Sequence, residues 1–100
     1  MHVVDLNDGR PHDPRPVLAG PWRYLRLLQL EPGAAEQLPA GDVEYAAYVV
    51  EGEGTAETGA GDFALAAGNS LVLLRGAGAT FTAGRAGFTV YLEAVDAPPR

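Results

Sequence analysis

The chain consists of short apolar runs separated by glycine-rich segments. The segments EPG, PAGD, EGEG, TGAG, AAGN, RGAG and AGRAG read as turns, and turn signals recur about every eight to twelve residues. The apolar runs predict β-strands at 22–31, 34–39, 43–51, 55–58, 62–66, 70–74, 80–83 and 87–95. Short strands at this spacing are typical of an antiparallel sandwich or barrel. No window repeats apolar residues at helical spacing over three turns, so we predict an all-β fold with little or no helix.

A proline-containing segment precedes the first predicted strand. Prolines stand at positions 11, 14 and 16. Proline fixes its own φ and pushes the residue before it toward extended geometry. We therefore predict an extended N-terminal arm over residues 1–20 and a barrel domain over residues 21–97. A chain of 100 residues has room for one core of this kind and not for two.

Composition excludes several classes of function. Thirteen acidic residues stand against seven arginines and no lysine, which gives a net charge of −6. Nucleic acid is not an expected partner, because the arginines are scattered among acids. Serine occurs only at Ser70, and histidine only at His2 and His12, outside the patterned region. A Ser-His-Asp triad in the core is therefore excluded, and the absence of cysteine excludes thiolate chemistry.

The sequence also predicts neither a membrane segment nor an export signal. No apolar run approaches the about 18 residues that a transmembrane helix needs. The start of the chain, MHVVDLNDGR, is acidic and lacks the apolar region of a signal peptide. There is no disulfide framework. We expect a cytoplasmic protein without a membrane partner.

The glycine spacing from Gly33 onward carries a family resemblance. Gly33 opens one motif that Gly52 of VVEGEG closes, and Gly68 opens a second motif, in which Leu74-Arg75-Gly76 follows after five residues. Residues 22–96 in this way resemble the cupin family. Its first motif is Gly, five residues, His-x-His, three or four residues, Glu, six residues, Gly, and its second is Gly, five residues, Pro-x-Gly, two residues, His. The resemblance implies a single-domain cupin barrel, a double-stranded jelly roll.

The metal ligands of the family are replaced in this chain. The two histidine positions of the first motif fall on Pro39 and Gly41, its glutamate position on Tyr45, and the histidine of the second motif on Ala79. Proline, glycine and alanine offer no side-chain donor, and tyrosine is a poor ligand near neutral pH. We therefore predict no metal and no other cofactor.

Two alternatives would restore a metal. Asp42 and Glu44 share one strand face, and a slip of one residue in register would turn both carboxylates inward. The N-terminal arm offers a second donor set, which a solvated acidic arm explains better: His2, Asp5, Asp8 and His12.

Tyr45 and one of two arginines are candidates for the inner face of the barrel. Tyr45 occupies a motif position that points inward, either as a site residue at the barrel mouth or as a core aromatic whose hydroxyl bonds to the backbone. Arg23 and Arg26 are three positions apart, so in a strand their side chains point to opposite faces. One of them must therefore point inward or lie at a strand end. Arg26, which shares a face with Tyr24 and Leu28, is the better candidate for binding a ligand oxygen. Its alternative is to lie at the rim or to pair with a nearby glutamate.

The last predicted strand has two possible orientations. In the first, which simple alternation favours, the apolar side chains of Phe88, Val90 and Leu92 face the core and Tyr91 and Glu93 lie outside. If the strand is inverted, as a polar cupin cavity allows, Tyr91 lines the pocket and Glu93 is the available acid or base. Trp22 either caps the barrel mouth or packs on it. The predicted site thus comprises Tyr45 and Glu93 as catalytic residues and Arg26, Tyr24, Tyr91 and Trp22 as substrate-binding residues.

These residues predict a metal-independent cupin that binds a small molecule. Isomerase, lyase or cyclase chemistry with Tyr, Glu and Arg is the enzymatic form of this hypothesis. The alternatives are a non-catalytic ligand sensor or structural dimeric barrel, and a metal-dependent enzyme with a carboxylate site. We expect a homodimer, because a small barrel cannot hide 47% hydrophobic residues and the arm could add a strand to a second subunit.

Overall fold

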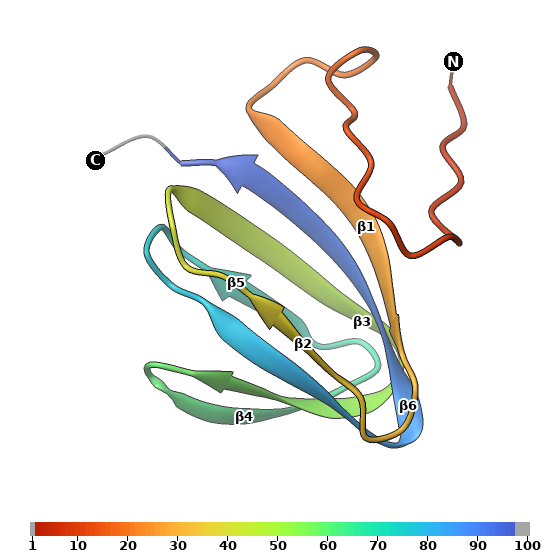
Figure 1. Ribbon diagram of the computed structural model, residues 1–100, viewed down its shortest axis with the longest axis vertical. Coiled ribbons are helices and arrows are strands. Elements are labelled where there is room, and N and C mark those ends of the chain that lie inside the picture. The colour runs from red at the N-terminus through yellow and green to blue at the C-terminus, as the bar shows by residue number, and fades with distance from the viewer. Residues whose placement is uncertain (1, 98–100) are drawn as a thin grey trace.

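The computed structural model describes residues 2–97, and all of its regular structure is β-strand (Figure 1). Within these residues no helix is long and apolar enough to cross a membrane. The strands are β1 (Trp22–Leu30), β2 (Ala35–Leu38), β3 (Val43–Thr58), β4 (Gly61–Ala66), β5 (Ser70–Leu73) and β6 (Ala79–Asp96).

Two long bent strands, β3 and β6, organise the molecule into two layers. The first half of β3 and the second half of β6 pair with each other and with β5 and β1. The second half of β3 and the first half of β6 pair with each other and with β4 and β2. All of these pairings are antiparallel. Figure 1 shows the two layers joined where β3 and β6 bend.

The glycine segments EGEG and AGRAG are bends within strands, so predicting turns there was wrong. The predicted strands 43–51 and 55–58 form one strand, β3, and 80–83 and 87–95 form one strand, β6. The pairing of β3 with β6 shifts register between Val49 and Glu51 and again between Gly52 and Gly54. Gly52 has a φ of 80°, and a Cβ atom there would lie 2.1 Å from the carbonyl oxygen of Gly87. Glycine therefore permits both the bulge and the close approach of the two backbones.

The space between the layers is filled with apolar side chains. Alternate residues of β3 and β6 point inward, which gives the buried positions 43, 45, 47 and 49 and 88, 90, 92 and 94. Phe81 of one layer meets Phe88 of the other edge-on, with ring centroids 6.0 Å apart. Phe81 is 0% exposed and Phe88 2% exposed. The aromatic pair thus closes the core near the bend.

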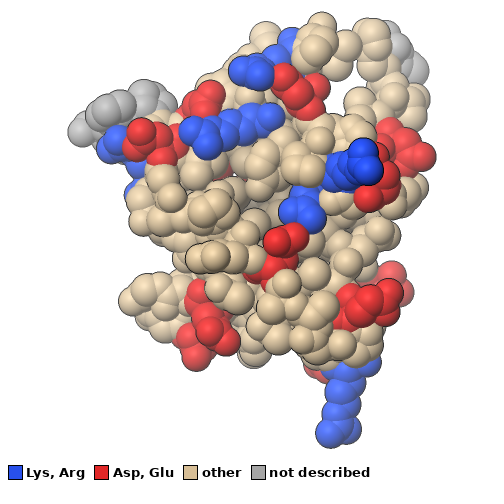
Figure 2. Space-filling model, viewed as in Figure 1, with Lys and Arg blue, Asp and Glu red and all other residues tan. Residues whose placement is uncertain are grey.

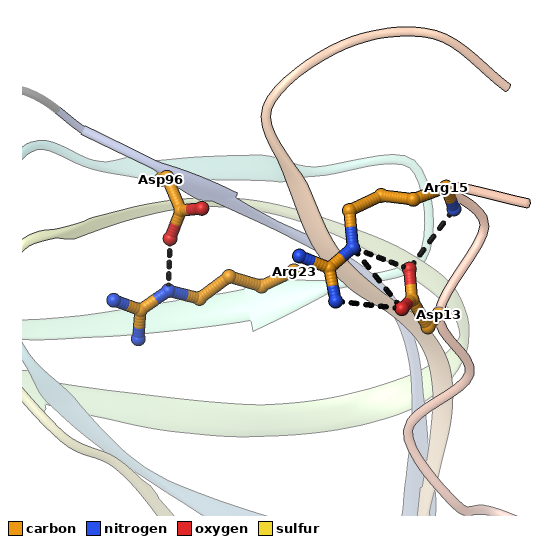
Figure 3. A network of polar contacts seen from close by, with 4 residues as sticks. All are labelled: Asp13, Arg15, Arg23 and Asp96. Carbon is orange, nitrogen blue, oxygen red and sulfur yellow. Dashed lines mark hydrogen bonds and ion pairs between the residues drawn. The ribbon is translucent and has the colours of Figure 1, made fainter.

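The N-terminal arm lies along β1. The backbone of His12 both donates to and accepts from Leu25, at 2.8 and 2.7 Å. Figure 3 shows two ion pairs at this end of the molecule, Arg15 with Asp13 inside the arm and Arg23 of β1 with Asp96 of β6. On the face drawn in Figure 2 the basic side chains lie beside acidic ones and form no basic patch.

Candidate functional site

Tyr45 lies on the inner face of β3 and is built into the core. Only 4% of its surface is exposed, and its hydroxyl donates a hydrogen bond of 2.8 Å to the carbonyl oxygen of Pro39. Burial raises the pKa of the Tyr45 phenol, so the group is neutral at physiological pH. The motif spacing correctly placed this side chain inward, and the hydroxyl has the backbone partner that a core tyrosine needs.

The positions of the family's metal ligands do not fit a metal ion. Ala79 is buried and pairs in register with Leu38, and the only oxygen donor among the four side chains, the Tyr45 hydroxyl, is already bonded to Pro39. A divalent ion needs several nitrogen or oxygen donors on one side. Within residues 2–97 no group of three or more His, Asp or Glu side chains could hold a metal ion.

The register slip that would turn Asp42 and Glu44 inward does not occur. Val43 and Tyr45 are the buried residues, so the two carboxylates face outward. Arg75 binds both, with its guanidinium 2.7 Å from Asp42 and its backbone N–H 3.1 Å from Glu44. The carboxylate metal site is therefore wrong for this chain.

His12 of the arm contacts one carboxylate rather than a cluster of donors. The His12 imidazole lies 2.9 Å from an Asp8 oxygen. A hydrogen bond from His12, with further help from the Arg10 backbone, lowers the pKa of Asp8.

Arg26 and Tyr24 also lie on the inner face, at the edge formed by β1. The Arg26 guanidinium donates to the Gly9 carbonyl at 2.6 Å and to Glu36 of β2 at 2.9 Å. This contact joins the edge strands of the two layers and the arm, so Arg26 adopts the glutamate-paired arrangement. Tyr24 lies in the same cross-strand row as Tyr45, with Ala94 between them. Burial raises the pKa of the Tyr24 phenol.

Tyr91 and Glu93 lie on the outer face of β6. The neighbouring positions Val90 and Leu92 are both 0% exposed, so the apolar set faces the core and the inverted arrangement is wrong. Trp22, at the start of β1, donates its indole N–H to the Ala19 carbonyl at 3.0 Å and packs on the preceding turn. The structure thus brings Tyr24, Arg26 and Tyr45 to one face and places Tyr91 and Glu93 on the other.

The sequence did not predict a cavity beside β4 and β5, which we call the β4–β5 cleft. It has a volume of about 540 Å³ and is lined by residues 58–60, Phe63 of β4, residues 71–74 around β5 and residues 76–78. None of the lining side chains is titratable. The only available signal was the run Leu71–Leu74, since alternation in a strand must leave part of such a run outside the core. Val72 and Leu74 are indeed 62% and 54% exposed.

The cleft lies beside two of the four motif positions. Leu73, which lines it, pairs in register with Tyr45, and Gly78, which also lines it, precedes Ala79. The part of the barrel that the motifs surround is therefore filled by Tyr45, while open space remains next to it, between β4 and β5.

Comparison with known proteins shows the fold. No family model and no curated protein matches the chain. Among solved structures, a cupin protein from Bacteroides fragilis matches with a TM-score of 0.73 and 16% identity, covering 100% of this chain and 85% of that one. The KdgF protein from Halomonas sp. matches with a TM-score of 0.64 and 19% identity, covering 84% and 77%. A sugar phosphate isomerase of the cupin superfamily from Silicibacter pomeroyi matches with a TM-score of 0.66 and 22% identity, covering 75% of this chain and 51% of that one.

The chain has the fold of a small cupin domain. This confirms the all-β fold that the pattern of short strands predicted and the cupin fold that the glycine spacing implied. At identities of this size the likeness extends to the fold, and function has to be argued from the cleft and from the motif positions themselves.

Proposed function

We propose that the protein is a metal-independent cupin that binds a small, uncharged molecule in the β4–β5 cleft. The observation that supports this most is the cleft itself, whose volume of about 540 Å³ lies in the range of small-molecule sites, about 300–1,000 Å³. Its walls are leucine, valine, alanine and phenylalanine side chains, together with Thr58 and backbone groups of the glycine-containing loops. Such walls favour an apolar ligand, and the backbone groups orient it.

The lining favours binding over acid–base chemistry. A general acid or base must lie within hydrogen-bonding reach of the reacting atom, and the cleft residues include no such group. A sugar phosphate, the substrate class in the name of one structural neighbour, calls for charge-assisted donors such as arginine. No arginine among residues 2–97 lines the cleft. The isomerase, lyase or cyclase form of the hypothesis has less support than ligand binding.

Fluorescence titration with N-phenylnaphthylamine, a neutral apolar probe, tests the proposal. We expect saturable binding that Leu74→Asp weakens at least about tenfold, because a carboxylate in an apolar cleft must be desolvated. Val50→Asp is the matched control, since Val50 is 49% exposed and lies outside the cleft. Equal affinity of the two variants, or no binding of the probe to the unmodified protein, would overturn the proposal.

Metal independence has its own measurement. After expression in metal-supplemented medium, elemental analysis should find no stoichiometric iron, zinc or manganese, because the motif positions supply too few donors. One equivalent of metal that persists when residues 2–12 are deleted would contradict this.

A structural barrel is the second candidate, and the filled interior supports it. The side chains of Phe81, Phe88, Leu92 and Tyr45 fill the space between the two layers of the barrel. For either function we propose a homodimer that uses the arm, where Val3 and Val4 are 93% and 44% exposed. Failure of the probe to bind, together with a stable dimer, would favour this candidate.

A further inference from the structure

A hollow on the outer face of β3, β5 and β6 contains the two polar residues that the cleft leaves unused. Tyr91 of β6 lies directly opposite Tyr48 of β3. In the adjacent row, Ala46 lies between Glu93 of β6 and Val72 of β5. Opposite residues in an antiparallel pair have Cβ atoms about 4.5–5.5 Å apart, so these side chains are neighbours.

The small side chain of Ala46 creates the hollow. Its methyl group forms a low floor, and the longer side chains of Tyr48, Tyr91, Glu93 and Val72 rise around it. The resulting cavity has a volume of about 210 Å³ and lies on the opposite face of the sheet from the core. We call it the Tyr48–Tyr91 hollow.

The chemistry of the walls is that of a cation site. The phenol rings of Tyr48 and Tyr91 line the hollow, and a cation within about 6 Å of the face of such a ring is attracted to it. Among the residues that the structure describes, Glu93 is the one charged side chain that lines the hollow, and no basic side chain lines it. Arg75, two residues after the end of β5, is paired with Asp42 at 2.7 Å. Burial raises the pKa of the Tyr91 phenol, and the Glu93 carboxylate adds to the shift, which is consistent with negative charge at this point.

We propose that the Tyr48–Tyr91 hollow binds a small organic cation carrying a methylated ammonium group. The methyl groups contact the rings and the Ala46 floor, and the charge faces the Glu93 carboxylate. Methylation weakens the hydration of an ammonium group, so such a cation loses less by leaving water than a primary ammonium does. The Tyr48–Tyr91 hollow lies next to the β4–β5 cleft, and the two share residues 71 and 72 of β5 among their lining.

The experiment compares choline with its neutral carbon analogue, in which a carbon atom replaces the ammonium nitrogen. Both are titrated into isotopically labelled protein, and affinity is read from backbone chemical shifts of β3, β5 and β6. We expect choline to bind at least about fivefold more tightly than the analogue, because only choline gains the charge-dependent attraction. Equal affinities, or shifts that do not saturate, would overturn the proposal.

Variants separate the hollow from the rest of the surface. Ala46→Leu fills the floor and should abolish choline binding, while Ala35→Leu on the exposed face of β2 is the matched control and should not. Glu93→Gln should weaken binding about fivefold, and Tyr91→Leu should weaken it more than Tyr91→Phe, which keeps the ring. Unchanged choline binding by Ala46→Leu would refute the site. Dissociation of a dimer by Ala46→Leu would also refute the site, because this face would then be a subunit interface.

Discussion

The substitution Tyr45→Phe tests whether Tyr45 is a core residue or a site residue. It removes only the hydroxyl, whose hydrogen bond to the Pro39 carbonyl is 2.8 Å long, and leaves the ring in a position 4% exposed. A typical hydrogen bond contributes about 0.5–1.5 kcal/mol net. Pro39 is itself exposed, so water can reach its carbonyl in the variant, and we expect a loss near 1 kcal/mol. Tyr45→Ala, which also removes the ring, should cost about 3–5 kcal/mol.

Urea denaturation and thermal melting give the free energy of unfolding. A loss of 1 kcal/mol corresponds to a fall in Tm of roughly 4–8 °C for a domain of this size. Binding of N-phenylnaphthylamine should be unchanged, because Tyr45 does not line the β4–β5 cleft. Tyr48→Phe is the control, since the Tyr48 side chain is 47% exposed and its hydroxyl should contribute little to stability. Lost probe binding with stability intact would refute this reasoning and make Tyr45 a site residue.

Three further predictions concern the edge, the assembly and the pH dependence. Arg26→Gln should lower the free energy of unfolding by about 1–2 kcal/mol and speed hydrogen exchange at the His12 amide, because Arg26 binds both the arm and Glu36. The exposed control Arg23→Gln should change stability by less than about 0.5 kcal/mol. Equal effects of the two substitutions would contradict this prediction. Sedimentation should show a dimer at micromolar concentration, and a sole 10.4 kDa species would count against it. Burial raises the pKa values of Tyr24 and Tyr45 above 10, so their neutral forms stabilise the fold below that pH. Above about pH 10 the protein should unfold as tyrosinate absorbance rises, and both changes should be smaller in Tyr45→Phe. Full tyrosinate formation in protein that stays folded would contradict the burial of these side chains.

The strands were predictable because alternation and glycine spacing are local features. The predicted strand at 22–31 is β1 at Trp22–Leu30, and the apolar positions of β6 face the core as simple alternation predicts. The bends were not predictable, because a glycine in a bulge and a glycine in a turn look alike in sequence. What distinguishes Gly52 is the backbone of Gly87 close against it, a contact between distant parts of the chain.

The sequence predicted less of the candidate site than of the strands. Motif spacing predicted the inward direction of Tyr45, but its acceptor is the backbone carbonyl of Pro39, which depends on the path of the loop between β2 and β3. The β4–β5 cleft lies between edge strands of two different layers, so no local pattern marks it. Tyr91 and Glu93 could be noticed as polar residues of a core strand, yet their shared hollow depends on Ala46 in a different strand.

Mapping a neutral ligand by backbone chemical shifts tests the central claim most directly. N-phenylnaphthylamine is titrated into labelled protein that has been dialysed against a chelator. If the claim is correct, saturating shifts gather on residues 58–63 and 71–78, which surround the β4–β5 cleft, and added zinc or iron changes nothing. Shifts centred instead on Tyr45 and Ala79, and appearing only when metal is restored, would contradict it.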